Sequence, residues 1–142
     1  MVLILPYPTN KKVKSAFCKE YSLNSIYAGK HWTKRKADKE YWRLLVLSEL
    51  KRQKIKPQMF QEPVEITFTW NDHLDCSNHA YMGKMIEDCL VGYLLHDDNR
   101  RYVKRIIHQF HDERYILIEV REYGGNNFEA MGRKKDIKSF ST

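Results

Sequence analysis

Hydrophobic and polar residues follow two different periods along the chain, and together these periods predict a mixed α/β fold. Four segments have the spacing or composition of strands: residues 1–8, 64–70, 102–110 and 115–121. Apolar and polar residues alternate strictly from Val64 to Trp70, which is typical of a half-buried strand. Asp112 and Glu113 supply a turn between the last two segments, so a C-terminal β-hairpin is predicted.

Two longer segments have apolar residues at helical spacing. The first runs from an N-cap at Thr33 to about Lys54, before the Lys56-Pro57 step. Its predicted core stripe contains Ala37, Tyr41, Leu44, Leu45 and Ser48, widened by Leu47 and Leu50, and we expect Trp42 in the core as well. The second starts near Asn78 and has the stripe Met82, Met85, Ile86, Cys89 and Leu90.

The length of 142 residues fits one compact domain with a hydrophobic core. We expect a small mixed sheet with two main helices over residues 1–123. Residues 11–30 have no clear period and predict loop rather than helix. Residues 124–142 contain few apolar side chains, and with the basic run 133–135 they predict a flexible basic tail.

The composition is that of an ordinary globular protein, with 42% hydrophobic and 30% charged residues. No apolar run is long enough to span a bilayer, and the start of the chain lacks the pattern of a signal peptide. Three cysteines are few and odd in number, which favours a reduced, cytoplasmic protein. Because no apolar run would span a bilayer, no membrane partner is expected.

Charge is strongly segregated along the chain, within a net charge of +7. Residues 1–56 carry fourteen lysines and arginines against four acids, whereas residues 57–99 carry one lysine against eight acids. Residues 100–142 are basic again, with ten against six. An acidic centre between basic flanks indicates cation binding in the middle of the chain and polyanion contacts on both sides.

The acids of the centre surround the second predicted helix. Asp72 and Asp75 precede it, and Asp97 and Asp98 follow it. A helix that packs back along the strand 64–70 would bring both pairs to one place, where carboxylates repel one another unless a cation lies between them. Hard oxygen ligands favour Mg²⁺, with Mn²⁺ as the alternative, and Lys84 would stabilise negative charge nearby.

Cations crowd the start of the first predicted helix, where the helix dipole makes them unfavourable unless an anion is held there. Trp32 adds the capacity to stack on a base. The sequence therefore predicts contacts to nucleic-acid phosphates, made by Lys30, Lys34, Arg35, Lys36, Arg100, Arg101, Lys104 and Arg105.

A second metal chemistry is compatible with the same region. His73, Cys76 and His79 have a spacing that Zn²⁺ sites use, and Cys89 would supply a fourth ligand. The surrounding carboxylates favour a harder ion. Zinc is therefore the minor alternative.

Four short motifs occur in an order that resembles the RusA family of Holliday junction resolvases. They are the segment Ser22 to Lys36, Asp75-x-x-Asn78, Lys84-x-x-x-Asp88, and Leu95-His96-Asp97-Asp98. The resemblance extends from about Leu23 to Val120. It implies a mixed α/β homodimer that uses Mg²⁺, held by aspartates, to cut opposed strands of four-way DNA junctions.

Mapped on this chain, the resemblance implies that Asp75 and Asp98 hold the metal with Asp97 beside them, and that Asn78 and Lys84 complete the catalytic set. The sequence departs from the family pattern where the second motif aspartate is Ser77. A neutral hydroxyl is a poor substitute for a charged metal ligand, unless Asp72, Glu87 or Asp88 replaces it. A catalytically impaired relative that binds junctions without cutting them is therefore the alternative function.

Overall fold

The computed structural model describes residues 1–124, which form a mixed α/β domain as predicted. Its elements are β1 (Val2–Pro6), α1 (Lys11–Glu20), α2 (Leu23–Tyr27), α3 (Trp32–Arg52), β2 (Val64–Trp70), a 3-10 turn η1 (Cys76–His79), α4 (Ala80–Leu90), β3 (Val103–Phe110) and β4 (Tyr115–Glu122). The predicted tail lies outside the described residues from position 125 onward.

The strands form one mixed sheet in the order β1-β4-β2-β3. β2 pairs with β4 antiparallel and with β3 parallel, and β1 pairs with β4 antiparallel. The predicted C-terminal hairpin is therefore wrong, because β2 lies between β3 and β4. The turn after β3 passes the end of β2, where the backbone N–H of His111 donates to the carbonyl of Trp70 over 3.0 Å.

The alternating pattern of β2 predicted a half-buried strand, but its central position in the sheet buries both of its faces. All seven of its residues are buried, including the polar Glu65, Thr67 and Thr69. The buried carboxylate of Glu65 pairs with Arg105 over 2.9 Å and with Arg121 over 2.8 Å. The neighbouring strands β3 and β4 therefore help to bury the polar face of β2, which was expected to be exposed, and their arginines neutralise Glu65 on it.

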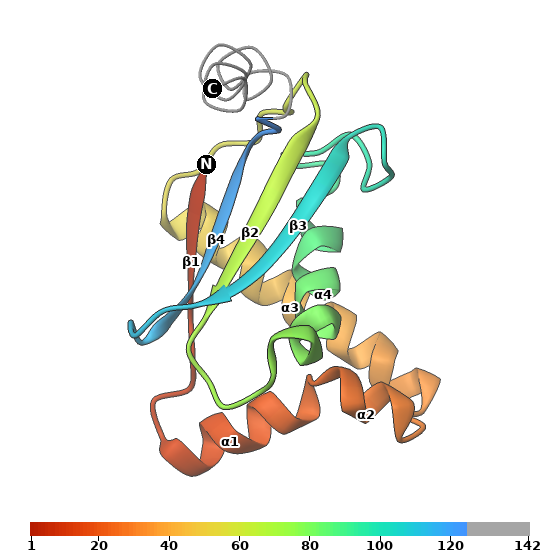
Figure 1. Ribbon diagram of the computed structural model, residues 1–142, viewed down its shortest axis with the longest axis vertical. Coiled ribbons are helices and arrows are strands. Elements are labelled where there is room, and N and C mark those ends of the chain that lie inside the picture. The colour runs from red at the N-terminus through yellow and green to blue at the C-terminus, as the bar shows by residue number, and fades with distance from the viewer. Residues whose placement is uncertain (125–142) are drawn as a thin grey trace, which may run out of the picture.

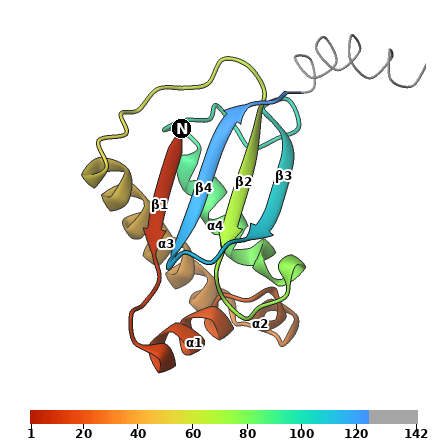
Figure 2. The ribbon, with the colours of Figure 1, turned by 60° about the vertical axis from the view of Figure 1, so that its left-hand side comes forward.

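α3 and α4 cover one face of the sheet, and α1 and α2 lie at the end of the sheet where β1 and β2 finish (Figures 1 and 2). From α3, Trp42, Val46 and Leu50 are fully buried. The predicted α3 stripe is displaced, since Tyr41 and Leu44 remain 42% and 58% exposed. Apolar residues are spread around α3, so periodicity alone does not identify the face that meets the sheet.

The segment predicted to be loop between residues 11 and 30 contains two short helices. Asn10 caps α1 by accepting hydrogen bonds from the backbone N–H groups of Lys12 and Val13. Ser22 caps α2 in the same manner through the N–H of Ser25. Caps and a few tertiary contacts stabilise these helices, and such short segments show no clear period.

β2, α4 and β3 form a βαβ unit in which α4 runs back across the sheet between two parallel strands. Gly83 allows the close approach of this helix. A Cβ at Gly83 would lie 2.9 Å from Cε1 of His108 and 3.5 Å from Cε2 of Phe68. The His108 ring has little freedom to move, because it stacks on Phe68 and its Nδ1 accepts a hydrogen bond from Trp70 Nε1.

We expect Gly83→Ala to lower the free energy of unfolding by about 1–2 kcal/mol, although alanine is the better helix former. Urea denaturation measures the change. In the His108→Ala background the same substitution should be neutral or stabilising, because the clashing ring is gone. An equal loss in both backgrounds would show that the ring of His108 does not restrict position 83.

Candidate metal centre and basic groove

One face of α4 and the loop before β3 together form a cluster of carboxylates. Lys84, Glu87 and Asp88 share a face because they are three and four residues apart on the helix. Asp98 reaches the same place from the loop. One oxygen from each of Glu87, Asp88 and Asp98 lies within 4.8 Å of the others, and we call these three residues the acid cluster.

The ammonium of Lys84 bonds to all three members of the acid cluster. Its Nζ lies 3.2 Å from Glu87 and 3.1 Å from Asp88, and it also pairs with Asp98. Burial lowers the pKa of Lys84, but its hydrogen bonds to Asp98 and Asp88 outweigh burial and raise the pKa overall. The hydrogen bond from Lys84 lowers the pKa of Asp98 in turn.

The charge of the acid cluster is only partly neutralised. Burial raises the pKa of Glu87, whose side chain is 10% exposed, and it outweighs the hydrogen bond from Lys84, which lowers that pKa. When all three carboxylates are ionised, one ammonium leaves two negative charges in excess. Three convergent carboxylate oxygens with this excess suit a hard divalent cation such as Mg²⁺ or Mn²⁺.

The structure brings Asp98 and Lys84 together but leaves Asp75 and Asp97 outside the acid cluster, contrary to the predicted metal set. Asp75 is exposed just before η1. Asp97 accepts hydrogen bonds within its own turn, from the N–H of Asp98 and the amide of Asn99. Asp75 follows the end of β2, whereas Asp98 precedes the start of β3. Because these strands are parallel, the two positions lie at opposite ends of a strand pair about 20 Å long.

The other residues before α4 hold the loop in place. Asn78 Oδ1 accepts a hydrogen bond from the N–H of Asn24 over 2.9 Å, which ties η1 to α2. The buried carboxylate of Asp72 bonds to Tyr7 and His79 over 2.7 Å each. Burial would raise the pKa of Asp72, but these hydrogen bonds lower it. Asp72 and Asn78 thus have structural partners, and Ser77 is exposed.

The zinc alternative finds no support in residues 1–124. Both ring nitrogens of His79 are already bonded, to Asp72 and to the carbonyl of Cys76. The thiol of Cys76 donates to the carbonyl of His108, and the thiol of Cys89 donates to the carbonyl of Met85. These side chains form no common group of ligands within the described residues.

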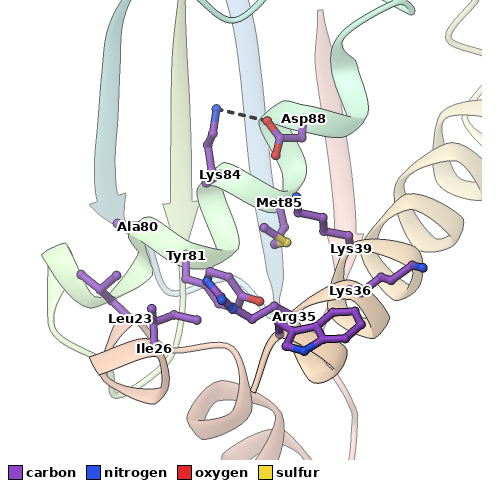
Figure 3. A pocket seen from close by; sticks show the side chains of 11 residues that line it. Leu23, Ile26, Arg35, Lys36, Lys39, Ala80, Tyr81, Lys84, Met85 and Asp88 are labelled. Atoms are coloured by element: carbon purple, nitrogen blue, oxygen red, sulfur yellow. Dashed lines mark ion pairs between the residues drawn. The ribbon is translucent and has the colours of Figure 1, made fainter. Parts of the chain in front are cut away.

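A groove of about 680 Å³ lies between α2, the start of α3 and α4 (Figure 3). We call it the basic groove. It is lined by Leu23, Ile26, Trp32, Arg35, Lys36, Lys39, Ala80, Tyr81, Lys84, Met85 and Asp88. Lys84 and Asp88 belong to both the groove and the acid cluster, so the two sites are continuous.

Three of the predicted DNA-binding residues line the basic groove: the base-stacking Trp32 and the phosphate-binding Arg35 and Lys36. Lys39 was missed, although it lies one helical turn after Arg35 and therefore on the same face of α3. In the described part of the chain Arg35, Lys36 and Lys39 form no ion pair. Their charge is therefore available to an anion.

Lys30 does not have the exposed position that phosphate contact requires. Its side chain is 4% exposed, and its Nζ pairs with Asp38 over 2.5 Å and with Glu20 over 3.1 Å. Tyr81 also donates to Asp38 over 2.8 Å, which links α3 to α4. Lys30 is therefore a structural residue, and its prediction as a DNA contact is corrected.

The remaining predicted contacts lie outside the basic groove. Lys34, Arg100, Arg101 and Lys104 are exposed on the surface. Arg105 is 54% exposed and pairs with Glu65, so its charge is partly used within the sheet.

No protein-family model, curated protein or solved structure matches the chain. The resemblance to RusA resolvases thus remains a prediction from the sequence. Within residues 1–124, no helix has the length and apolar character that crossing a membrane requires. The cysteines Cys18, Cys76 and Cys89 are all free thiols.

We expect Lys30→Met to lower the free energy of unfolding by about 3–5 kcal/mol, because it leaves the carboxylate of Asp38 buried without its cation. Thermal and urea denaturation measure the loss. The control is Lys34→Met, which removes an exposed lysine nearby and should change stability by less than about 0.5 kcal/mol. Similar losses in both variants would contradict the buried ion pair.

A second prediction concerns the counter-charge of the acid cluster. Lys84→Met should lower stability at pH 7 by about 1 kcal/mol, a modest value because water screens the half-exposed ammonium. Lys84 holds the pKa of Asp98 low, so its stabilisation is present above the ordinary pKa of about 4 and is lost as the pH falls.

The deficit of Lys84→Met should therefore stay nearly constant from pH 7 to about pH 5 and shrink as the pH falls below about 4, which urea denaturation at several pH values between about pH 7 and pH 2 measures. Lys84→Arg, which keeps a cation, is the matched control. A deficit that stays constant over this range would rule out an electrostatic role for Lys84.

Proposed function

We propose that this protein is a divalent-metal-dependent endodeoxyribonuclease that cuts four-way DNA junctions. The observation that carries the proposal is the continuity of the acid cluster with the basic groove through Lys84 and Asp88. Metal-dependent phosphodiester hydrolysis requires the metal ion and the groups that hold the phosphate to lie side by side. The choice of a four-way junction comes from the resemblance of the sequence to RusA resolvases.

Arg35, Lys36 and Lys39 would hold the DNA backbone along α3. Arg35 and Lys36 lie near the N-terminal end of α3, where the positive end of the helix dipole also favours phosphate. Contacts of this kind give affinity that does not depend on base sequence and that falls steeply with salt.

Glu87, Asp88 and Asp98 would hold Mg²⁺ or Mn²⁺. When bound, such an ion supplies a Lewis acid for the phosphate and a more acidic water as nucleophile. Lys84 now neutralises these carboxylates. When a bound metal ion also neutralises the carboxylates, the half-exposed ammonium of Lys84 would be free to pair with a phosphate oxygen and to stabilise negative charge there.

The proposal includes a homodimer. Paired cuts in opposed strands of a junction require two active sites, and a two-fold axis places two identical sites symmetrically. Sedimentation or light scattering should give twice the monomer mass of 17.1 kDa.

The position of Asp75 favours a second candidate, a protein that binds junctions without cutting them. The acid that the resemblance assigns to the metal is not in the acid cluster, and Ser77 replaces another. The two candidates share the basic groove and differ in whether the acid cluster supports hydrolysis.

A nicking assay on a labelled four-way junction with Mg²⁺ or Mn²⁺, run beside a gel shift, tests the proposal. The protein should cut the junction, and Asp88→Asn should reduce cleavage by about 100-fold or more while affinity for the junction is retained. Asp75→Asn should cut nearly as well as the unchanged protein. Binding without cleavage under either metal would favour the second candidate.

Lys39→Ala should weaken junction binding at low salt, whereas its matched control Lys51→Ala, on the same helix but outside the groove, should not.

The two aspartate variants separate the two assignments of the metal ligands. If Asp75→Asn abolishes cleavage and Asp88→Asn does not, the acid cluster is not the metal centre.

A further inference from the structure

The basic groove has apolar walls, which a site for phosphates alone does not need. Leu23 and Ile26 of α2 face Tyr81 and Met85 of α4 across it, and the cationic side chains of α3 lie beside them (Figure 3). Its volume of about 680 Å³ is within the range of about 300–1,000 Å³ that small-ligand pockets occupy. The groove thus offers an apolar pocket with cations on one side.

Trp32 gives this pocket an exposed aromatic surface. Its side chain is 61% exposed, whereas Trp42 and Trp70 are fully buried. An indole held at a groove wall beside unpaired cations is the arrangement that stacks nucleic-acid bases. An exposed indole ring leaves a large apolar surface in contact with water, and a base stacked on it would bury that surface and so gain hydrophobic free energy.

The charges around the pocket restrict its occupant. Arg35, Lys36 and Lys39 form no ion pair among residues 1–124, and the first turn of α3 contains no acid. A ligand that carries a flat apolar group and, close to it in the same molecule, a negative charge would match both the apolar walls and the cations. Nucleotides have this combination of a base and a phosphate.

The geometry points to an unpaired base rather than a duplex. Bases inside a duplex are stacked on both faces and cannot enter a pocket between helices. Bases at branch points, ends and single strands are free to do so. We propose that the basic groove takes one unpaired nucleobase of DNA, stacked on Trp32, with its flanking phosphates on the α3 cations. This inference rests on the proposed function, because it specifies how a branched substrate is recognised.

Fluorescence offers a direct test, because Trp32 is the exposed one of the three tryptophans. Titration with single-stranded oligothymidylate should quench its emission and protect it from acrylamide. A duplex of the same length should protect it far less. Trp32→Phe should lose the signal but keep the affinity in a competition assay, since phenylalanine also stacks.

Trp32→Ala should weaken oligothymidylate binding by about tenfold or more. The matched control is Tyr27→Ala, which removes an aromatic side chain that is 79% exposed on α2 but does not line the groove, and should leave affinity unchanged. Thermal denaturation establishes that both variants are folded. Equal affinity of Trp32→Ala and the unchanged protein would overturn the proposal.

The nicking assay distinguishes failure of this inference from failure of the proposed function. If junctions are cut and oligothymidylate leaves Trp32 unaffected, the base pocket is wrong and the nuclease stands. If Trp32 binds oligothymidylate and no junction is cut, the base pocket stands and the nuclease fails. Protection of Trp32 that rises with protein concentration in the absence of DNA would assign the groove to a second copy of the chain and overturn the proposal.

Discussion

The parallel pairing of β2 with β3 is the constraint on which the rest of the molecule depends. A parallel pair needs a crossover, and α4 supplies it by running back across the sheet. Gly83 lets the helix approach the stacked rings of Phe68 and His108. The crossover determines which side chains of α4 are exposed, and it also determines where the following loop arrives.

The acid cluster and the basic groove both follow from that placement of α4. One face of the helix presents Glu87 and Asp88 to Asp98 of the loop, and the adjoining face turns toward α2 and α3. Lys84 lies at the boundary and neutralises part of the acidic charge. The buried pair of Lys30 and Asp38 then fixes the start of α3, so that its free cations line the groove instead of dispersing over the surface.

Much of the fold was readable from local patterns. Strand β2, the two long helices and the mixed α/β class follow from hydrophobic periodicity, which depends on neighbours in sequence. The strand partners did not follow, because the short turn after β3 suggested a hairpin and nothing local reveals that β2 lies between β3 and β4. The buried face of α3 was missed for a similar reason, since its apolar residues surround the helix and the sheet selects Trp42, Val46 and Leu50.

The sequence by itself determined that acids gather around α4 and cations around α3, because charge segregation is a property of residue order. It also identified Asp98, Lys84, Trp32, Arg35 and Lys36 as members of a candidate site. Only the tertiary structure decided that Glu87 and Asp88, not Asp75, meet Asp98, since strand direction determines which end of the sheet each loop reaches. It likewise decided that Lys30 is buried while Lys39 faces the groove, because the burial of a charge depends on partners far away in the sequence.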